Sequence, residues 1–270
     1  MPPTHLIDAH AHFHWSASRE DFARYNVSRL AAGDVIGIDC HVASILGTWG
    51  RNSPTYFASP DDVVAGNEAM YAIADAEPAK VRSYVHVNPN HTEHALSEIA
   101  RGVARGAIGV KLSASRRADD PLNDPIAADA GTRGMPVLHH IWQHRQRDWG
   151  MQEASDAFEL ARLAERHPQT NFILAHIGGG GDWAHSIEIV RTLPNVFPDL
   201  SGSGVDRGML DAWLTALGAQ RLLWAADLTL CTGLAKLQAL EVIGMSQDDL
   251  DAICWRNAAR IFPANSFGFA

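Results

Sequence analysis

The sequence predicts an α/β protein of the (β/α)8 TIM-barrel class, formed as a single domain over residues 1–270. Eight short apolar segments of strand type alternate with helical segments, at intervals of roughly 25 to 45 residues. Strands that alternate with helices form βαβ units and a parallel sheet. The length of 270 residues suits one barrel, and no break in composition marks a second domain. An open, doubly wound parallel sheet is the structural alternative.

The predicted strands share apolar and often β-branched residues, bounded by glycine, proline or polar turns. Gly33 and Asp34 are expected to turn the chain into the second of these strands. The predicted strands are residues 6–13, 35–45, 81–87, 107–112, 136–141, 171–177, 196–200 and 221–226.

The segments between the strands carry helix start and stop signals. Ser59-Pro60-Asp61-Asp62 predicts a helix start, with serine as N-cap, proline at the first helical position and acidic residues in the first turn. Gly106 is a typical stop for the helix before it. The predicted helices are a short one ending near residue 32 and residues 59–77, 92–105, 125–130, 154–166, 182–193, 205–217, 233–243 and 246–261.

Composition narrows the choice of partner. The formal net charge is -9 and no run of lysine or arginine occurs, which argues against nucleic acid. The apolar stretches are too short to cross a membrane. The three cysteines, Cys40, Cys231 and Cys254, are widely spaced and indicate no disulfide framework, so a reducing cytoplasm is expected. A small-molecule substrate remains as the expected partner, and the composition is compatible with a homo-oligomer.

The first strand ends in two histidines, His10 and His12. Side chains at i and i+2 of a strand point to the same face, about 7 Å apart along the strand. Two neutral imidazoles on one strand can bind one metal ion, because imidazole suits zinc, iron, nickel and copper. An isolated pair of this kind is more often structural, so the case depends on the rest of the chain.

Further polar residues follow the same pattern at the ends of later strands. In a barrel the active site lies at the C-terminal ends of the strands. Unpaired polar groups beside a core are costly, and one metal ion can satisfy several of them. The polar residues at predicted strand ends are His10, His12, His86, Lys111, His139, His140, His176, Asp199, Ser201 and Asp227.

These motifs resemble the amidohydrolase superfamily, in the branch with aminocarboxymuconate-semialdehyde decarboxylase, the γ-resorcylate decarboxylases and small lactonases. The resemblance covers nearly the whole chain. It implies a divalent metal held by His10, His12, His140 and Asp227, and we expect one ion, zinc or manganese. His176 is then a second-metal ligand or an acid/base group. The matching motifs are Ile7-Asp8-Ala9-His10-Ala11-His12, Gly109-Val110-Lys111-Leu112, Pro136-Val137-Leu138-His139-His140, Leu174-Ala175-His176-Ile177-Gly178-Gly179, Asp199-Leu200-Ser201-Gly202, Leu222-Leu223-Trp224-Ala225-Ala226-Asp227 and Asn257-Ala258-Ala259-Arg260-Ile261-Phe262.

The chain departs from the family at two places. The strand-5 motif usually runs Pro-Val-x-x-His, which selects His140, so His139 is expected to face the barrel wall. On strand 8 the family often has Gly-Ser-Asp-x-Pro. This chain has Ala225-Ala226-Asp227-Leu228-Thr229, so the aspartate is kept while the turn after it differs.

Lys111 has three interpretations. In other branches of the superfamily a strand-4 lysine, carboxylated by CO2, bridges two metal ions, and this chain has the residues for such a pair. We favour one metal ion. Lys111 is then a free cation that binds a substrate carboxylate, and His86 helps to orient this carboxylate. The third interpretation is a structural ion pair between Lys111 and Asp199.

The sequence therefore predicts a metal-dependent hydrolase or lyase that acts on a small carboxylated organic substrate, cyclic compounds included. In lactone or amide hydrolysis, Asp227 would be the general base for a metal-activated water, and His176 would stabilise the oxyanion or relay a proton. The alternatives are a non-oxidative decarboxylase of an aromatic or muconate-type acid, and a metal-independent or non-catalytic barrel that binds a small acid. A nucleotide-binding sheet would need a glycine-rich fingerprint where the chain has His10-Ala11-His12.

Several loop residues are candidates for the wall of the pocket. The long loop after residue 45 is a candidate lid or pocket wall. Trp15, Trp49, Trp142 and Trp149 fall in or near loops expected over the barrel mouth, where they either line a pocket or pack the loops. The four glycines 178–181 predict a tight turn beside the metal.

Overall fold

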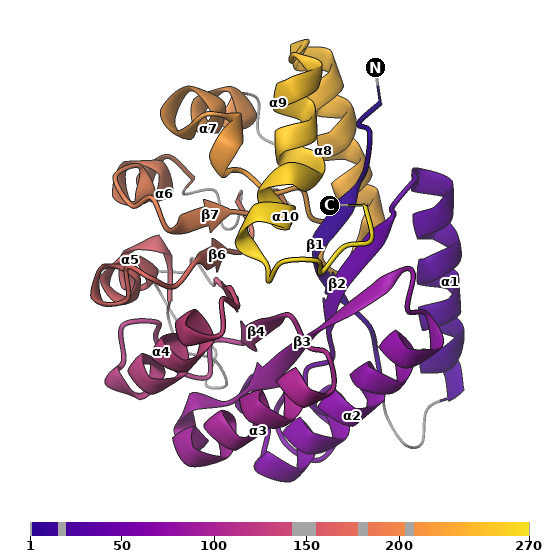
Figure 1. Ribbon diagram of the computed structural model, residues 1–270, viewed down its shortest axis with the longest axis vertical. Helices are drawn as coiled ribbons and strands as arrows, with labels where there is room; N and C mark the ends of the chain where they lie inside the picture. Colours follow the sequence, from indigo (N-terminus) through magenta and orange to yellow (C-terminus); the bar gives the residue numbers. More distant parts are fainter. Residues whose placement is uncertain (1, 16–19, 142–154, 178–182, 203–207, 270) are drawn as a thin grey trace.

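The computed structural model describes residues 2–15, 20–141, 155–177, 183–202 and 208–269. Within them, seven parallel strands form one curled sheet in the order β1 to β7, and the helices lie around its outside (Figure 1). Each strand pairs with the next one in sequence, as βαβ units require. The strands are β1 (Ile7–His12), β2 (Cys40–Ser44), β3 (Val81–Val87), β4 (Gly109–Leu112), β5 (Val137–His139), β6 (Phe172–Leu174) and β7 (Val196–Pro198).

Residues 221–226, predicted as the eighth strand, lie between β7 and β1. The amide of Leu223 donates to the carbonyl oxygen of Pro198 at 3.0 Å, and the amide of Ala9 donates to the carbonyl oxygen of Trp224 at 3.2 Å. The segment thus bonds to both neighbouring strands through short bridges rather than a regular ladder. The predicted (β/α)8 barrel is confirmed.

The helices begin largely where the sequence signals place them. The Ser59 side chain accepts a hydrogen bond from the Asp62 amide at the start of α2, and Asp156 with Glu159 forms a capping box at the start of α5. A turn of π-helix, residues 252–256, joins the last two helices. The helices are α1 (Glu20–Ile36), α2 (Pro60–Ala76), α3 (Thr92–Ala104), α4 (Asp124–Thr132), α5 (Ala157–Arg166), α6 (Trp183–Val190), α7 (Met209–Leu217), α8 (Leu230–Ile243), α9 (Gln247–Asp251) and α10 (Asn257–Ile261).

The prediction for the start of the second strand is wrong. Val35 lies in the last turn of α1 and is 89% exposed, and β2 begins only at Cys40. The helix ends at Gly37, which adopts a left-handed φ of 91°. Gly33, predicted as part of a turn, lies inside the helix. A glycine suits this position because a Cβ atom would lie 2.6 Å from Nε2 of His41. Val35 and Ile36, the β-branched pair at the end of α1, have the residue types of a strand, which explains the wrong prediction.

Two apolar layers fix the positions of the strands. The larger one lies between the sheet and the surrounding helices and includes Val110, Val137 and Trp224. A second cluster fills the barrel interior, where the hydroxyl of the fully buried Tyr84 donates to the carbonyl oxygen of Ala9 at 2.6 Å. Side chains alternate between these layers along a regular strand, so the residue after an outward-facing one enters the barrel.

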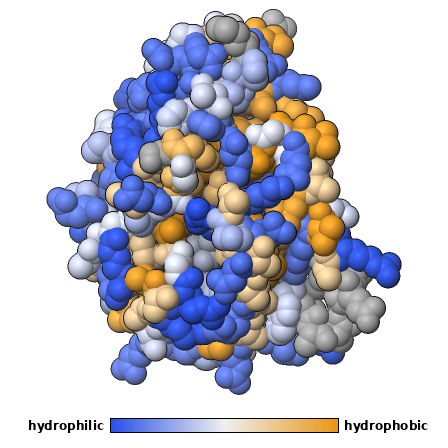
Figure 2. Space-filling view, turned by 45° about the vertical axis from the view of Figure 1, so that its right-hand side comes forward, coloured by the Kyte–Doolittle hydropathy of each residue, from blue (hydrophilic) through white to orange (hydrophobic). Residues whose placement is uncertain are grey.

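The surface is mixed. Figure 2 shows a face on which hydrophilic side chains surround scattered apolar patches. Exposed apolar residues of the described segments include Val27 and Val35 on α1 and Val242 on α8. Among the described helices, none is both long enough and apolar enough to span a bilayer.

Candidate metal centre

A bulge in β1 brings both predicted histidine ligands into the barrel. The register between β1 and β2 shifts between Asp8 and Ala11, where β1 has one residue more than its partner. An extra residue reverses the alternation of side chains along a strand. His10 and His12 therefore share the interior side with Ala9 of the inner apolar cluster, where strict alternation would turn them outward.

His10, His12 and Asp227 form the one metal-type cluster found among the described residues. The two imidazole Nε2 atoms are 3.2 Å apart, and Asp227 Oδ1 lies 3.6 Å from Nε2 of His10 and 3.4 Å from Nε2 of His12. The histidine side chains are buried, whereas the Asp227 side chain keeps 19% of its surface exposed. The cluster is thus held in the barrel and open on the aspartate side.

The hydrogen bonds of the two imidazoles assign their tautomers. Nδ1 of His10 donates to Oδ2 of Asp199 at 2.9 Å, and Nδ1 of His12 donates to the carbonyl oxygen of Ser44 at 3.2 Å. Both Nε2 atoms therefore carry lone pairs, and these face each other and the Asp227 carboxylate. This is the arrangement in which metal-bound histidines are usually held.

The residues present fit a divalent metal ion. Two imidazoles on one tetrahedral ion at about 2.0–2.1 Å have nitrogens roughly 3.4 Å apart, close to the spacing of His10 and His12. Burial, and next the charge of Lys111, lowers the pKa of both imidazoles well below its usual value. Both rings are therefore neutral at physiological pH, which is the form that binds metal.

Lys111 lies directly beside this cluster. Its side chain is fully buried, and Nζ donates to Nε2 of His10 at 2.9 Å. Burial lowers the pKa of Lys111 to about 8, although the charges of Asp227 and Asp199 oppose the shift. The ion pair with Asp199, the third interpretation from the sequence, is not formed within the described part of the chain. Instead Lys111 occupies the His10 lone pair that a metal ion needs, and it must release this lone pair when metal binds.

The backbone of Asp227 has an unusual conformation. Its φ is 58°, in the left-handed region, and its amide donates to the carbonyl oxygen of His10 at 2.7 Å. Burial, together with the charge of Asp199, raises the pKa of the Asp227 carboxyl to about 6, against the opposing effect of Lys111. A carboxyl group with this pKa changes its charge close to neutral pH.

His140 and His176 adjoin the three clustered residues. Nε2 of His176 and Nδ1 of His140 share a hydrogen bond of 2.9 Å. Nδ1 of His176 lies 3.1 Å from Oγ of Ser201 and 3.7 Å from Oδ2 of Asp227. Burial lowers the pKa of His176 to about 4. His176 thus lies next to Asp227 and His140 lies next to His176, and their roles as metal ligands stay predictions.

The other two strand-end histidines differ in position. His86 pairs in register with Lys111, and its Nε2 lies 3.0 Å from Oγ of Ser113. Its Nδ1 is buried without a hydrogen-bond partner among the described residues, so its predicted role toward substrate stays open to test. His139 faces the barrel wall as expected, where its Nε2 lies 2.7 Å from Oγ of Ser155.

Two aromatic side chains lie near the cluster, and the edge of Trp49 faces His12 at 5.9 Å between ring centroids. The Trp49 ring stacks on His14 at 4.3 Å between centroids, and its Nε1 donates to the carbonyl oxygen of Phe13. Tyr56, in a short 3-10 turn (Thr55–Phe57), stacks on His140 at 5.2 Å.

The other residues predicted for the pocket wall are not found beside the cluster or are not described. Trp15 is partly buried and packs beside β1. Trp142, Trp149 and glycines 178–181 lie outside the described residues.

Sequence reasoning missed Ser44, Tyr56 and Lys236. Lys236 belongs to α8, and its Nζ donates to the carbonyl oxygens of Ser201, at 2.8 Å, and of Gly202. The signal for Lys236 was a lone lysine among Leu and Ala in a mostly apolar helix.

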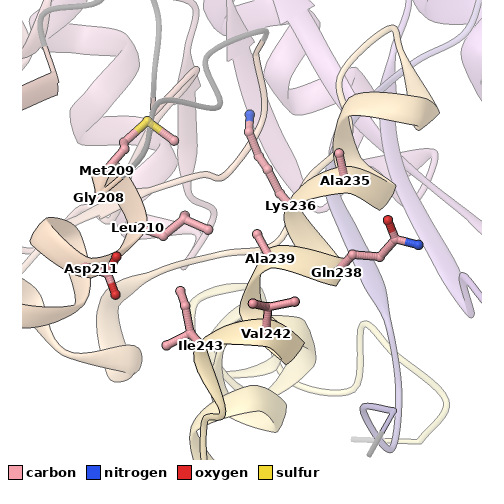
Figure 3. A pocket seen from close by; sticks show the side chains of 10 residues that line it. All are labelled: Gly208, Met209, Leu210, Asp211, Ala235, Lys236, Gln238, Ala239, Val242 and Ile243. Carbon is pink, nitrogen blue, oxygen red and sulfur yellow. The ribbon is translucent and has the colours of Figure 1, made fainter.

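Figure 3 shows the cavity of about 400 Å³ that Lys236 borders between α7 and α8. Its lining is mainly apolar, and the Lys236 side chain extends along it toward the end of β7. This cavity is separate from the metal-type cluster.

A barrel with two histidines on β1 and an aspartate after the eighth strand defines the class of metal-dependent α/β-barrel enzymes. The chain belongs to the amidohydrolase family, whose model matches residues 7–264. This confirms the resemblance found in the sequence. No curated protein gives a significant match.

Solved structures with the same fold include decarboxylases of aromatic acids. The 5-carboxyvanillate decarboxylase of Sphingomonas paucimobilis has a TM-score of 0.71 and 19% identity, over 96% of this chain and 98% of that chain. The 2,6-dihydroxybenzoate decarboxylase of Rhizobium has a TM-score of 0.70 and 16% identity, over 97% and 98%. A dihydroxybenzoic acid decarboxylase of Polaromonas sp. JS666, solved with manganese and the inhibitor 2-nitroresorcinol, has 0.70 and 16%, over 97% of each chain.

Proposed function

We propose that the chain is a metal-dependent lyase that removes a carboxyl group as CO2 from a small hydroxylated aromatic acid. The observation that carries the proposal is the buried Lys111 ammonium beside the donors of His10, His12 and Asp227. A cation next to a metal site suits a substrate that carries two neighbouring oxygen groups: a carboxylate for the cation and a hydroxyl for the metal. The likeness to barrel decarboxylases favours this activity over the hydrolysis expected first from the sequence.

His10, His12 and Asp227 would hold the metal ion, with His140 as a further candidate ligand. Manganese in the Polaromonas structure makes that ion as good a candidate here as zinc. When bound, a divalent ion polarises a substrate oxygen and stabilises the negative charge that develops on it.

Lys111 would bind the carboxylate of the substrate. An ion pair in this buried position is strong, because little water screens it. During the reaction the bond between ring and carboxyl carbon breaks, its electron pair stays with the ring, and CO2 leaves. The ring carbon then takes one proton. This proton comes from solvent, and His176 would relay it by giving up one proton as it takes up another, since its Nδ1 lies 3.7 Å from the Asp227 carboxylate and its Nε2 is hydrogen-bonded to His140.

The aromatic residues beside the cluster would hold the ring of the substrate. Tyr56 stacks on His140, and the edge of Trp49 faces His12 at 5.9 Å between ring centroids. Flat side chains favour a flat ligand, and stacked aromatic pairs add about 0.5–1.5 kcal/mol beyond their burial. They would also keep water away from the developing negative charge.

Hydrolysis of a lactone or amide is the second candidate. It is favoured by the Asp227 carboxylate, which keeps 19% of its side-chain surface exposed beside the two imidazoles. A carboxylate with a pKa of about 6 is a suitable general base near neutral pH.

The test is a product assay in D2O with protein loaded with manganese or zinc. A panel of hydroxybenzoic acids and a panel of lactones are offered side by side. We expect CO2 release from an acid and one deuterium at the ring carbon that lost the carboxyl group. Lys111→Met should raise KM for that acid, whereas Lys80→Met, which alters an exposed lysine paired with Asp34, should not. Lactone turnover with no CO2 from any acid would replace this proposal by hydrolysis.

A further inference from the structure

The backbone conformation of Asp227 needs a structural support. A residue other than glycine with φ near 58° is uncommon, because its Cβ atom then crowds the following carbonyl oxygen. The neighbours Ala226 and Leu228 supply no glycine or proline that would favour such a turn. The surrounding structure must therefore hold the backbone of the residues on either side of Asp227.

One buried ion pair contacts the backbone of the residue before Asp227 and of the residue after it. The Ala226 amide donates to Oδ1 of Asp8 at 2.9 Å, on one side of Asp227. On the other side, Nη1 of Arg29 donates to the carbonyl oxygen of Leu228 at 3.1 Å. Nη2 of the same guanidinium donates to Oδ2 of Asp8 at 3.0 Å. The pair thus bridges the turn from its two ends.

The pair is rigid and shielded from water. The Arg29 side chain is 2% exposed and that of Asp8 is fully buried. His41 Nδ1 also lies 3.1 Å from Oδ2 of Asp8, and the hydroxyl of Tyr25 donates to the Leu228 carbonyl oxygen at 3.1 Å. A planar guanidinium can donate to two acceptors in fixed directions, which an ammonium cannot do equally well.

We propose that Arg29, acting with Asp8, is a positioning residue for Asp227, although it belongs to α1 and contacts none of the clustered donor atoms. The pair keeps Asp227 in the left-handed conformation that directs its carboxylate toward His10 and His12. It takes the place of a turn sequence with its own conformational preference. This inference rests on the proposed metal site, because positioning is measured here through metal binding.

The test is a double-mutant cycle read by Mn²⁺ affinity in calorimetry. The four proteins are the parent, Arg29→Met, Asp227→Ala and the double variant. If Arg29 acts through Asp227, Arg29→Met should weaken Mn²⁺ binding ~10-fold to ~100-fold in the parent background, as supporting residues of metal sites do. In the Asp227→Ala background the same change should weaken it less than about threefold, because no carboxylate remains to be positioned.

Two further variants guard against loss of folding. Removing Arg29 leaves the Asp8 charge unpaired in the interior, which can prevent folding. Arg29→Lys keeps the charge, and Tyr25→Phe removes only one hydroxyl bonded to Leu228, so both enter the same cycle. We expect smaller losses that again disappear with Asp227→Ala. Arg24→Met, at an exposed position of α1, is the control and should leave affinity unchanged.

The outcomes separate this inference from the proposed metal site. If the parent protein binds no Mn²⁺ or Zn²⁺, the metal site is wrong and the role of Arg29 fails with it. If the parent binds metal but the folded Arg29 variants lose equal affinity in both backgrounds, or lose none, only the positioning role is overturned.

Discussion

Replacing Asp199 by asparagine should weaken metal binding while it keeps the size and shape of the side chain. Oδ2 of Asp199 accepts from Nδ1 of His10 at 2.9 Å. Oδ1 accepts from the Ser201 amide at 2.9 Å, from the Ser201 hydroxyl at 2.5 Å and from the His176 amide at 3.1 Å. Both oxygens of this buried carboxylate are therefore needed as acceptors, and an amide has only one.

Either orientation of the asparagine side chain is unfavourable. If its oxygen stays toward His10, its NH2 group faces the amides of Ser201 and His176, and each lost acceptor costs about 1–3 kcal/mol. If its NH2 group faces His10, Nδ1 of that ring must accept and Nε2 takes the proton. The lone pair for the metal is then lost. We expect metal affinity to fall ~10-fold to ~100-fold, or about 1.4–2.7 kcal/mol.

The assay combines calorimetry of Mn²⁺ or Zn²⁺ binding with ¹⁵N NMR of the histidine rings. The parent protein should show His10 protonated at Nδ1, and Asp199→Asn should shift protonation toward Nε2 as affinity falls. Asp248→Asn is the control, since the side chain of Asp248 is 85% exposed. A folded Asp199→Asn protein with the tautomer and affinity of the parent would refute the reasoning.

Two further predictions concern charge at the site. Metal affinity should rise with pH in two steps. The first lies near pH 6, where the Asp227 carboxyl ionises, and the second near pH 8, where Lys111 loses its proton and frees the His10 lone pair. A flat calorimetric profile between pH 5 and 9 would contradict this prediction. Lys111→Met should keep one metal ion per chain and lose the upper rise, as metal analysis and the same profile can show. Carboxylated Lys111 would instead be favoured by two results together: Lys111→Met loses metal, and bicarbonate increases metal binding by the parent protein after its metal has been removed.

The sequence predicts the strand ends well because they follow a local rule. Asp227 and His176 each close an apolar strand, and a parallel barrel gathers such ends at one face. His10 and His12 were correctly expected to project together. The bulge that turns them inward was not predictable, because it depends on the register with β2. Val35 was misassigned for a related reason, since a β-branched residue on an exposed helix resembles a strand.

The supporting contacts of the site could not be derived from sequence patterns. The hydrogen bond from His10 to Asp199 joins residues 189 positions apart, and that from Ala226 to Asp8 spans 218. No periodicity or spacing connects such pairs. Lys111 is an intermediate case: its place at a strand end was predicted, but its hydrogen bond to His10 depends on the width of the barrel.

The most direct test of the account is anomalous diffraction from crystals of the metal-loaded protein, recorded on both sides of the absorption edges of manganese and zinc. We expect one metal ion per chain, bound by Nε2 of His10, Nε2 of His12 and the carboxylate of Asp227. An ion elsewhere in the chain, no ion after exposure to either metal, or two ions bridged by a carboxylated Lys111 would contradict it.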